Sequence, residues 1–168
     1  ASLGHNHRST LAALYNLGVL LRTLERHDEA ESMLWRVLED RETSLGLTHP
    51  ETLSSLNTLA DLLMARGAHQ LAEALHRRAL DGRESALGPT HPDTLESLHG
   101  LGELMRARGR HSQAEEMYRR ALEGREANLG PGHPDTLTTV CSLALLLRVM
   151  GRHIESEELH RRVLEGRE

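Results

Sequence analysis

The chain has 168 residues, a hydrophobic fraction of 38% and a formal net charge of −5 at pH 7. This mildly acidic, evenly mixed balance provides no electrostatic footprint for nucleic acid or for an anionic membrane surface. Aromatic residues make up only 2% and phenylalanine is absent, so leucine and alanine must supply the core, which favours helices over strands.

One pattern returns every 42 residues along the chain. It reads Leu-Gly-x-x-His-x-x-Thr-Leu, and its copies begin at Leu3, Leu45, Leu87 and Leu129. Self-similarity at a period of this size indicates a solenoid, in which each unit buries its apolar face against its neighbours. Both ends of the chain fall within the pattern, so we expect a fragment of a longer array. The repeats occupy residues 1–42, 43–84, 85–126 and 127–168 of a single array.

Each repeat is predicted to form two antiparallel helices. In the second repeat, Pro50 and Glu51 suit the first turn of a helix, and leucines follow at helical spacing. Gly67 suits a left-handed helix end, and a second apolar stripe runs on from His69. The same plan predicts helices near residues 8–24, 27–45, 50–66, 69–87, 92–108, 111–129, 134–150 and 153–167.

The turn between the two helices has one exception. Gly109 and Gly151 occupy it in the third and fourth repeats, whereas the first repeat has Glu25. Because side chains disfavour the left-handed conformation that glycine supplies there, the first turn should differ from the others or be slightly strained.

The repeats match a known pattern of small and large residues. In the third repeat, the matching positions are Leu98, Leu101, Gly102, Met105, Gly109, His111, Ala114, Tyr118 and Ala121. On these residues the chain resembles the tetratricopeptide repeat family. The period of 42, the Leu-Gly-x-x-His-Pro-Asp connector and the Ala-Glu-x-x-x-Arg-Arg-Ala-Leu segment are similar to the kinesin light chain subfamily. The resemblance implies an all-α, right-handed α-solenoid of four helix-turn-helix repeats.

The resemblance also implies a concave groove lined by the first helix of each repeat. Its inward positions vary here while the core positions repeat, and they combine both charge signs with apolar residues at the ends. Such a groove suits an extended peptide, although ordinary solvent-facing variation without a ligand remains the alternative. Some family members clamp a C-terminal carboxylate with a Lys and an Asn of the first helices. This chain lacks both residues at the equivalent positions, so we do not expect a carboxylate clamp. The candidate groove residues are Tyr15, Val19, Arg22, Asn57, Asp61, Met64, His99, Glu103, Arg106, Cys141, Leu145 and Arg148.

Neither metal binding nor catalysis is indicated by the remaining polar residues. The chain has twelve histidines, but those in the connector and at the start of each second helix recur with the repeat, which marks structural positions. No pair has the spacing of a helical zinc site, and no glycine-rich phosphate loop is present. Cys141 has no partner in a catalytic motif. We therefore expect no catalytic residues, no metal and no cofactor.

The leading interpretation is a non-enzymatic scaffold that binds a peptide or protein segment in the groove. The alternatives are a structural module that self-associates end to end, and a regulatory array of a larger signalling protein. We expect neither nucleic acid nor a membrane as a partner. A single cysteine and the absence of an apolar run long enough to span a bilayer favour a cytoplasmic location.

Overall fold

The computed structural model describes residues 8–165, and these residues form eight α-helices and no strand. The predicted helix bounds are confirmed to within about one residue wherever the chain is described. The final residues of the last predicted helix, 166 and 167, lie outside the described residues. The helices are α1 (Arg8–Thr23), α2 (His27–Leu45), α3 (Pro50–Ala65), α4 (His69–Leu87), α5 (Pro92–Ala107), α6 (His111–Leu129), α7 (Pro134–Val149) and α8 (His153–Glu165).

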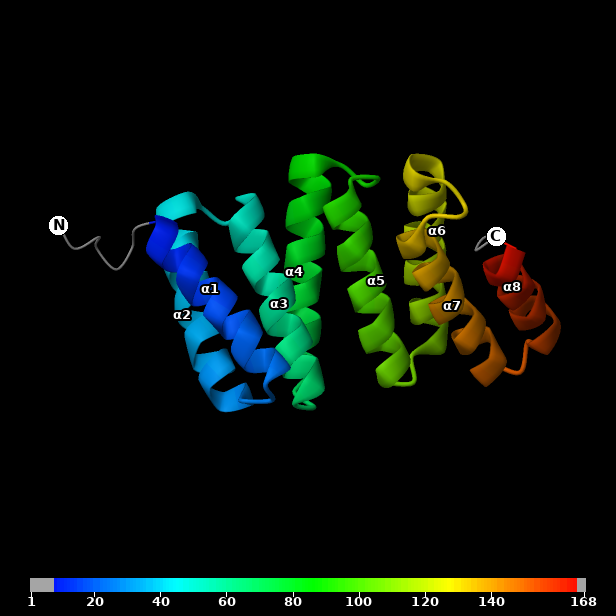
Figure 1. Ribbon diagram of the computed structural model, residues 1–168, viewed down its shortest axis with the longest axis horizontal. Coiled ribbons are helices and arrows are strands. Elements are labelled where there is room, and N and C mark those ends of the chain that lie inside the picture. Colours follow the sequence, from blue (N-terminus) through cyan, green and yellow to red (C-terminus); the bar gives the residue numbers. More distant parts are fainter. Residues whose placement is uncertain (1–7, 166–168) are drawn as a thin grey trace. The chain divides into compact units, whose positions relative to one another are not determined.

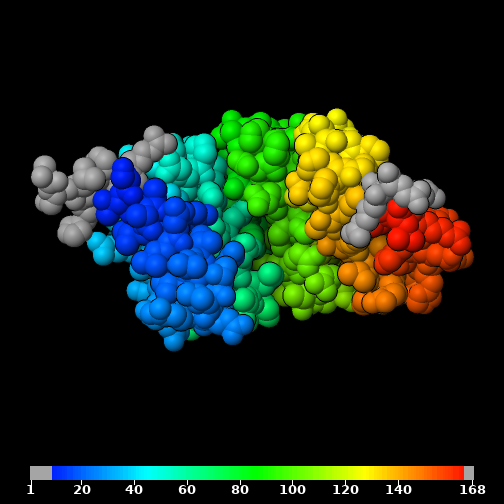
Figure 2. Space-filling view, viewed as in Figure 1, coloured from blue at the N-terminus to red at the C-terminus, as the bar shows by residue number. Residues whose placement is uncertain are grey.

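The chain divides into two compact units, Ala1–Ala86 and Leu87–Glu168, each holding two repeats. In each unit the helices of one repeat form an antiparallel pair, and the second helix of the leading repeat packs on the first helix of the next (Figure 1). The two first helices of a unit, α1 and α3 or α5 and α7, also touch. Figure 2 shows α1 in blue at the surface of the first unit and α7 in orange at the surface of the second. This is the helical repeat solenoid expected from the sequence.

A histidine and a proline begin the first helix of each of the last three repeats. Nδ1 of His49 accepts a hydrogen bond of 3.2 Å from the backbone N–H of Glu51, and Pro50 takes the first helical position. His91 and His133 cap α5 and α7 in the same way, also at 3.2 Å. These three connector histidines are therefore N-caps, which satisfy an N–H that would otherwise lack a partner within the helix.

The turn inside each repeat requires a left-handed residue. Gly67, Gly109 and Gly151 have φ angles of 77°, 70° and 79°. Glu25 adopts the same conformation with φ of 59°, and it is the one non-glycine residue with positive φ among the described residues. The first turn thus keeps the backbone of the others and is strained, because a side chain in this region is unfavourable.

Small residues allow the paired helices to approach closely. Ala30, Ala72 and Ala114 are completely buried at the start of the second helices. Gly102 faces the buried ring of Tyr118, and a Cβ atom added to the glycine would lie 2.7 Å from Cε1 of that ring. The core is otherwise built from leucine, as the composition predicts.

An arginine joins the two repeats of each unit, and it is buried in the first unit and half-buried in the second. In the first unit, Nη1 of Arg41 donates to the backbone oxygen of Glu51 at 3.0 Å and to Oγ of Ser55 at 2.8 Å. In the second, Nη1 of Arg125 makes the corresponding bonds to Asp135 at 3.0 Å and to Thr139 at 2.7 Å. Each arginine lies on the second helix of one repeat and fixes the first turns of the next repeat's first helix.

Candidate peptide-binding face

The predicted groove residues all lie on first helices, at half-buried or exposed positions. The structure brings them together within each unit, since α1 touches α3 and α5 touches α7. In the first unit they are Tyr15, Val19 and Arg22 on α1 with Asn57, Asp61 and Met64 on α3. In the second unit they are His99, Glu103 and Arg106 on α5 with Cys141, Leu145 and Arg148 on α7. We call each of these two sets of residues the first-helix face of its unit.

In the first unit, polar bonds connect α1 to α3 across the first-helix face. The hydroxyl of Tyr15 lies 2.7 Å from Oγ1 of Thr58 and 3.2 Å from Oγ of Ser54. The guanidinium of Arg41 stacks on the Tyr15 ring, 4.6 Å from its centroid. Further along the same helices, Nη1 of Arg22 pairs with Oδ2 of Asp61 at 3.5 Å. These contacts hold the two helices in register.

Beneath this face lies the imidazole of His76, which is almost fully buried. Its Nδ1 lies 3.4 Å from Oδ1 of Asn57, and its Nε2 lies 3.4 Å from Oδ1 of Asp61 without hydrogen-bond geometry. Burial, together with the positive charge of Arg83, lowers the pKa of His76 to about 4. At neutral pH the ring is therefore uncharged and acts as part of the core.

In the second unit, two aromatic rings form the floor of the first-helix face. His99 and Tyr118 have ring centroids 5.6 Å apart, and Nε2 of His99 lies 3.2 Å from Oγ of Ser142 on α7. Burial, followed by the charge of Arg125, lowers the pKa of His99. An uncharged His99 therefore connects α5 to α7 at the position where Tyr15 connects α1 to α3.

Glu103 links the surface to this floor. Its Oε1 accepts a bond of 2.6 Å from the hydroxyl of Tyr118, and its Oε2 accepts from Nη2 of Arg106 at 2.6 Å. Burial alone would raise the pKa of Glu103, but hydrogen bonds from Tyr118, Arg106 and Ser142 outweigh it and hold the pKa below its ordinary value. Burial and the bond to Glu103 raise the pKa of Tyr118.

The fourth repeat has no acid at the position of Asp61 and Glu103. Leu145 takes the place of Asp61 and Glu103, and its side chain is 42% exposed. Whereas Arg22 pairs with Asp61 and Arg106 with Glu103, Arg148 forms no ion pair within residues 8–165. An apolar side chain and an unpaired cation are therefore exposed together on α7, one turn apart.

The sequence analysis missed these two arginines. Arg41 and Arg125 bond to the next repeat, Arg41 also stacks on the Tyr15 ring, and the charge of Arg125 acts on His99. Their signal is visible in the sequence, because arginine recurs at positions 41, 83 and 125 with the repeat period. An arginine that recurs among core positions indicates a structural role, as the connector histidines do.

The described residues hold no group of three or more His, Cys, Asp or Glu side chains that could bind a metal ion. Cys141 is a half-buried free thiol. No helix within the described part of the chain is long and apolar enough to cross a membrane.

Two tetratricopeptide repeat models match the sequence, one over residues 51–127 and the other over residues 10–51 and 136–168. Among solved structures, a putative kinesin light chain from Podosopora anserina, with nearly identical TPR-like repeats, superposes with a TM-score of 0.81. That match has 27% identity and covers 98% of this chain and 78% of that one.

Two further structures share the fold. BtubC (BKLC) from P. vanneervenii has a TM-score of 0.86 at 19% identity, over 94% of this chain and 63% of that one. MamA has a TM-score of 0.68 at 17% identity, over 93% and 77%. No curated protein matches the chain.

The helix pairs, the recurring small residues and these matches agree on one class of protein, a helical repeat scaffold. The chain belongs to the tetratricopeptide repeat family, as an array of the kinesin light chain type. Repeats of this family are general scaffolds for protein–protein interaction and are typically non-enzymatic.

Proposed function

We propose that the protein is a non-enzymatic scaffold that binds an extended segment of a partner protein along the first-helix face. The observation that supports this most directly is the exposed pair of Leu145 and Arg148 on α7. An apolar side chain beside an unpaired guanidinium matches a peptide that carries an apolar residue next to a carboxylate. The Glu103–Arg106 pair on α5 supplies polar contacts of both signs in the same unit.

The proposal is tested by selecting binders from a random peptide library and measuring their affinity for two variants. Arg148→Gln removes the unpaired cation of the first-helix face. Arg161→Gln makes the same charge change on α8, where Arg161 is exposed and pairs with Glu157 at 2.6 Å. Selected peptides should lose affinity for Arg148→Gln and keep it for Arg161→Gln. Equal affinity for both variants, or no enriched sequence at all, would overturn the proposal.

End-to-end self-association is a second candidate, favoured by the apolar surface of α1. Leu17 and Leu20 share one side of that helix and Leu24 directly follows its end, and the three are 43%, 53% and 57% exposed. Sedimentation across a concentration series tests the idea, with Leu20→Glu expected to reduce any association. Leu71→Glu on α4, where the leucine is 43% exposed, is the matched control. A wild-type chain that stays monomeric at every concentration would exclude this candidate.

A further inference from the structure

The second helix of the first repeat departs from the repeat pattern at Trp35, the single tryptophan of the chain. The corresponding residues of the other repeats are Arg77, Arg119 and Arg161. Each of these arginines pairs with a glutamate four residues earlier, at 2.8, 2.8 and 2.6 Å. Trp35 therefore places an aromatic ring where the other three repeats carry an exposed arginine that is paired with a glutamate.

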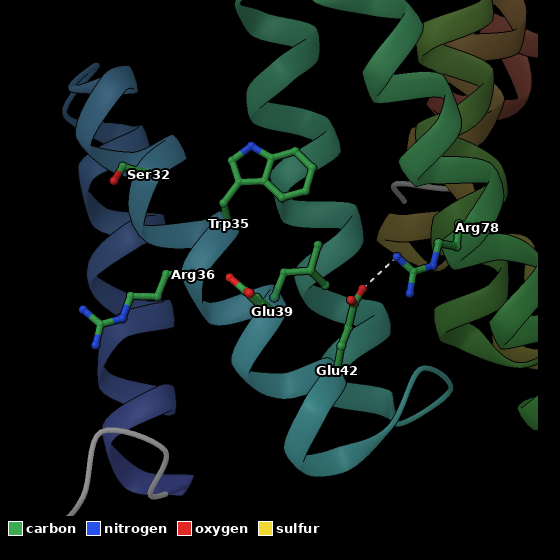
Figure 3. Close-up of a pocket in the computed structure, with 7 residues that line it drawn as sticks. Ser32, Trp35, Arg36, Glu39, Glu42 and Arg78 are labelled. Atoms are coloured by element: carbon green, nitrogen blue, oxygen red, sulfur yellow. Dashed lines mark ion pairs between the residues drawn. The ribbon is translucent and has the colours of Figure 1, made fainter.

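Trp35 forms part of a groove on the first unit, between α2 and α4. The groove has a volume of about 440 Å³. Figure 3 shows the side chains of Trp35 and Glu39 in this groove, and the guanidinium of Arg78 facing Glu42. Because Trp35 and Glu39 are one helical turn apart, they share one side of α2. The lining residues are Ser32, Trp35, Arg36, Leu38, Glu39 and Glu42 of α2 with Arg78 of α4.

The charges of the groove leave one carboxylate without a counter-charge. Arg78 pairs with Glu42 at 2.7 Å, and Arg36 pairs with Asp40 at 3.9 Å. Glu39 is exposed and forms no ion pair with any residue that the structure describes. An anionic occupant would be repelled by this carboxylate, and a wholly apolar one would have to bury it unpaired. The groove therefore favours a cation.

The indole ring of Trp35 favours a guanidinium over an ammonium as the bound cation. The indole of Trp35 is half-buried, so part of its surface is open to the groove. A guanidinium is planar, is weakly hydrated and stacks on aromatic faces more readily than an ammonium does. It can also donate to a carboxylate at the same time. We propose that this groove binds an arginine side chain of a partner protein, with its guanidinium on the Trp35 ring and paired with Glu39.

The other repeats provide internal controls for this arrangement. Asp81 and Glu123 occupy the position of Glu39 in the second and third repeats, and both are exposed acids. The residues one turn before them are Arg77 and Arg119, which would repel a second cation. The combination of an aromatic ring with an uncompensated acid therefore occurs only in the first repeat among the described residues.

Intrinsic fluorescence tests the proposal directly, because Trp35 is the sole tryptophan and its emission reports on this groove alone. The probe is the capped tripeptide acetyl-Ala-Arg-Ala-amide. The comparison peptide replaces arginine by citrulline, which has the same shape without the charge. The arginine peptide should change the emission saturably and the citrulline peptide should not. Glu39→Gln should weaken the binding by up to about fivefold, the upper end for an exposed ion pair.

Two variants make the test specific. Asp81→Asn removes an equivalent exposed acid away from the tryptophan and should bind the peptide as the wild type does. Trp35→Arg introduces the arginine that the other repeats carry and should fold normally. It should abolish binding of the peptide, which is measured for this variant by the amide NMR shifts of residues 32–42. Equal responses to the two peptides, unchanged affinity in Glu39→Gln, or equal losses in Glu39→Gln and Asp81→Asn would each overturn the proposal. The outcome is independent of the first-helix face, because that face contains no tryptophan.

Discussion

The hydroxyl of Tyr118 donates a 2.6 Å hydrogen bond to Oε1 of Glu103, so a buried aromatic ring of α6 is tied to a carboxylate on the first-helix face of α5. His76 and Asp61 occupy the corresponding positions in the second repeat, with 3.4 Å between Nε2 and Oδ1. The acids of the first-helix face therefore have a second role beneath the surface. A change made there to alter binding also alters the packing of the helix pair.

Acid denaturation should depend on Glu103. Its pKa is held below the ordinary value of 4.5, so its ionised form stabilises the fold above that pH and this contribution is lost as the pH falls through the lowered pKa. We predict that Glu103→Gln loses stability less steeply than the wild type below about pH 4.5. The measurement is the free energy of unfolding by urea across a pH series. Glu123→Gln, an exposed acid on α6, should follow the wild-type curve, and a parallel curve for Glu103→Gln would contradict the prediction.

Gly102 should be coupled to Tyr118. A methyl group at position 102 would lie 2.7 Å from Cε1 of the ring, and overpacking of this kind costs about 1–3 kcal/mol against a helix-propensity gain of about 1 kcal/mol. Gly102→Ala should therefore destabilise the wild type by up to about 2 kcal/mol. In a Tyr118→His background the same change recreates the Ala60–His76 pair of the second repeat and should be neutral or stabilising. Additive effects in this double-mutant cycle would show that the ring does not press on the glycine.

The sequence predicts the helices of this protein more completely than its side-chain contacts. Leucine periodicity and the His-Pro and glycine signals predict each described boundary to within about one residue. Periodicity also places Glu103 on the first helix of its repeat, where the structure has it half-buried on α5. It says nothing of Tyr118, because that ring reaches Glu103 from the other helix of the pair. Contacts between helices depend on side-chain length and direction, which a helical pattern does not contain.

The groove beside Trp35 illustrates the same limit. On the second helices, Arg77, Arg119 and Arg161 each form an ion pair with the glutamate four residues earlier. The sequence shows the exception at position 35, because Trp35 stands where the other repeats have arginine. Its consequence, an uncompensated Glu39 in an open groove, depends on Arg78 of α4 pairing with Glu42 instead.

Replacing Glu25 by glycine should relieve the strain of the first turn and stabilise the fold. Glu25 has φ of 59°, in the region that glycine occupies at the same turn in the other repeats. A non-glycine residue there costs about 1–2 kcal/mol, and the greater freedom of glycine in the unfolded chain offsets part of the gain from removing that strain. We predict that Glu25→Gly raises the free energy of unfolding by about 0.5–1 kcal/mol. Gly67→Ala, the reverse change at the equivalent turn, should lower it. A loss of stability in Glu25→Gly would mean that the glutamate side chain makes a compensating contact.

Arg41 should stabilise the packing of the first repeat against the second. The residue is 4% exposed, and its guanidinium bonds to Glu51 and Ser55 while it stacks on Tyr15. Lysine keeps the charge but cannot hold the planar stack and both hydrogen bonds at once. We predict that Arg41→Lys lowers the free energy of unfolding by about 2–3 kcal/mol, because buried acceptors lose their donor. Arg77→Lys, on the exposed side of α4, should change it by less than about 0.5 kcal/mol. Urea denaturation followed by circular dichroism measures both, and similar small effects would mean that the repeats are joined by apolar packing alone.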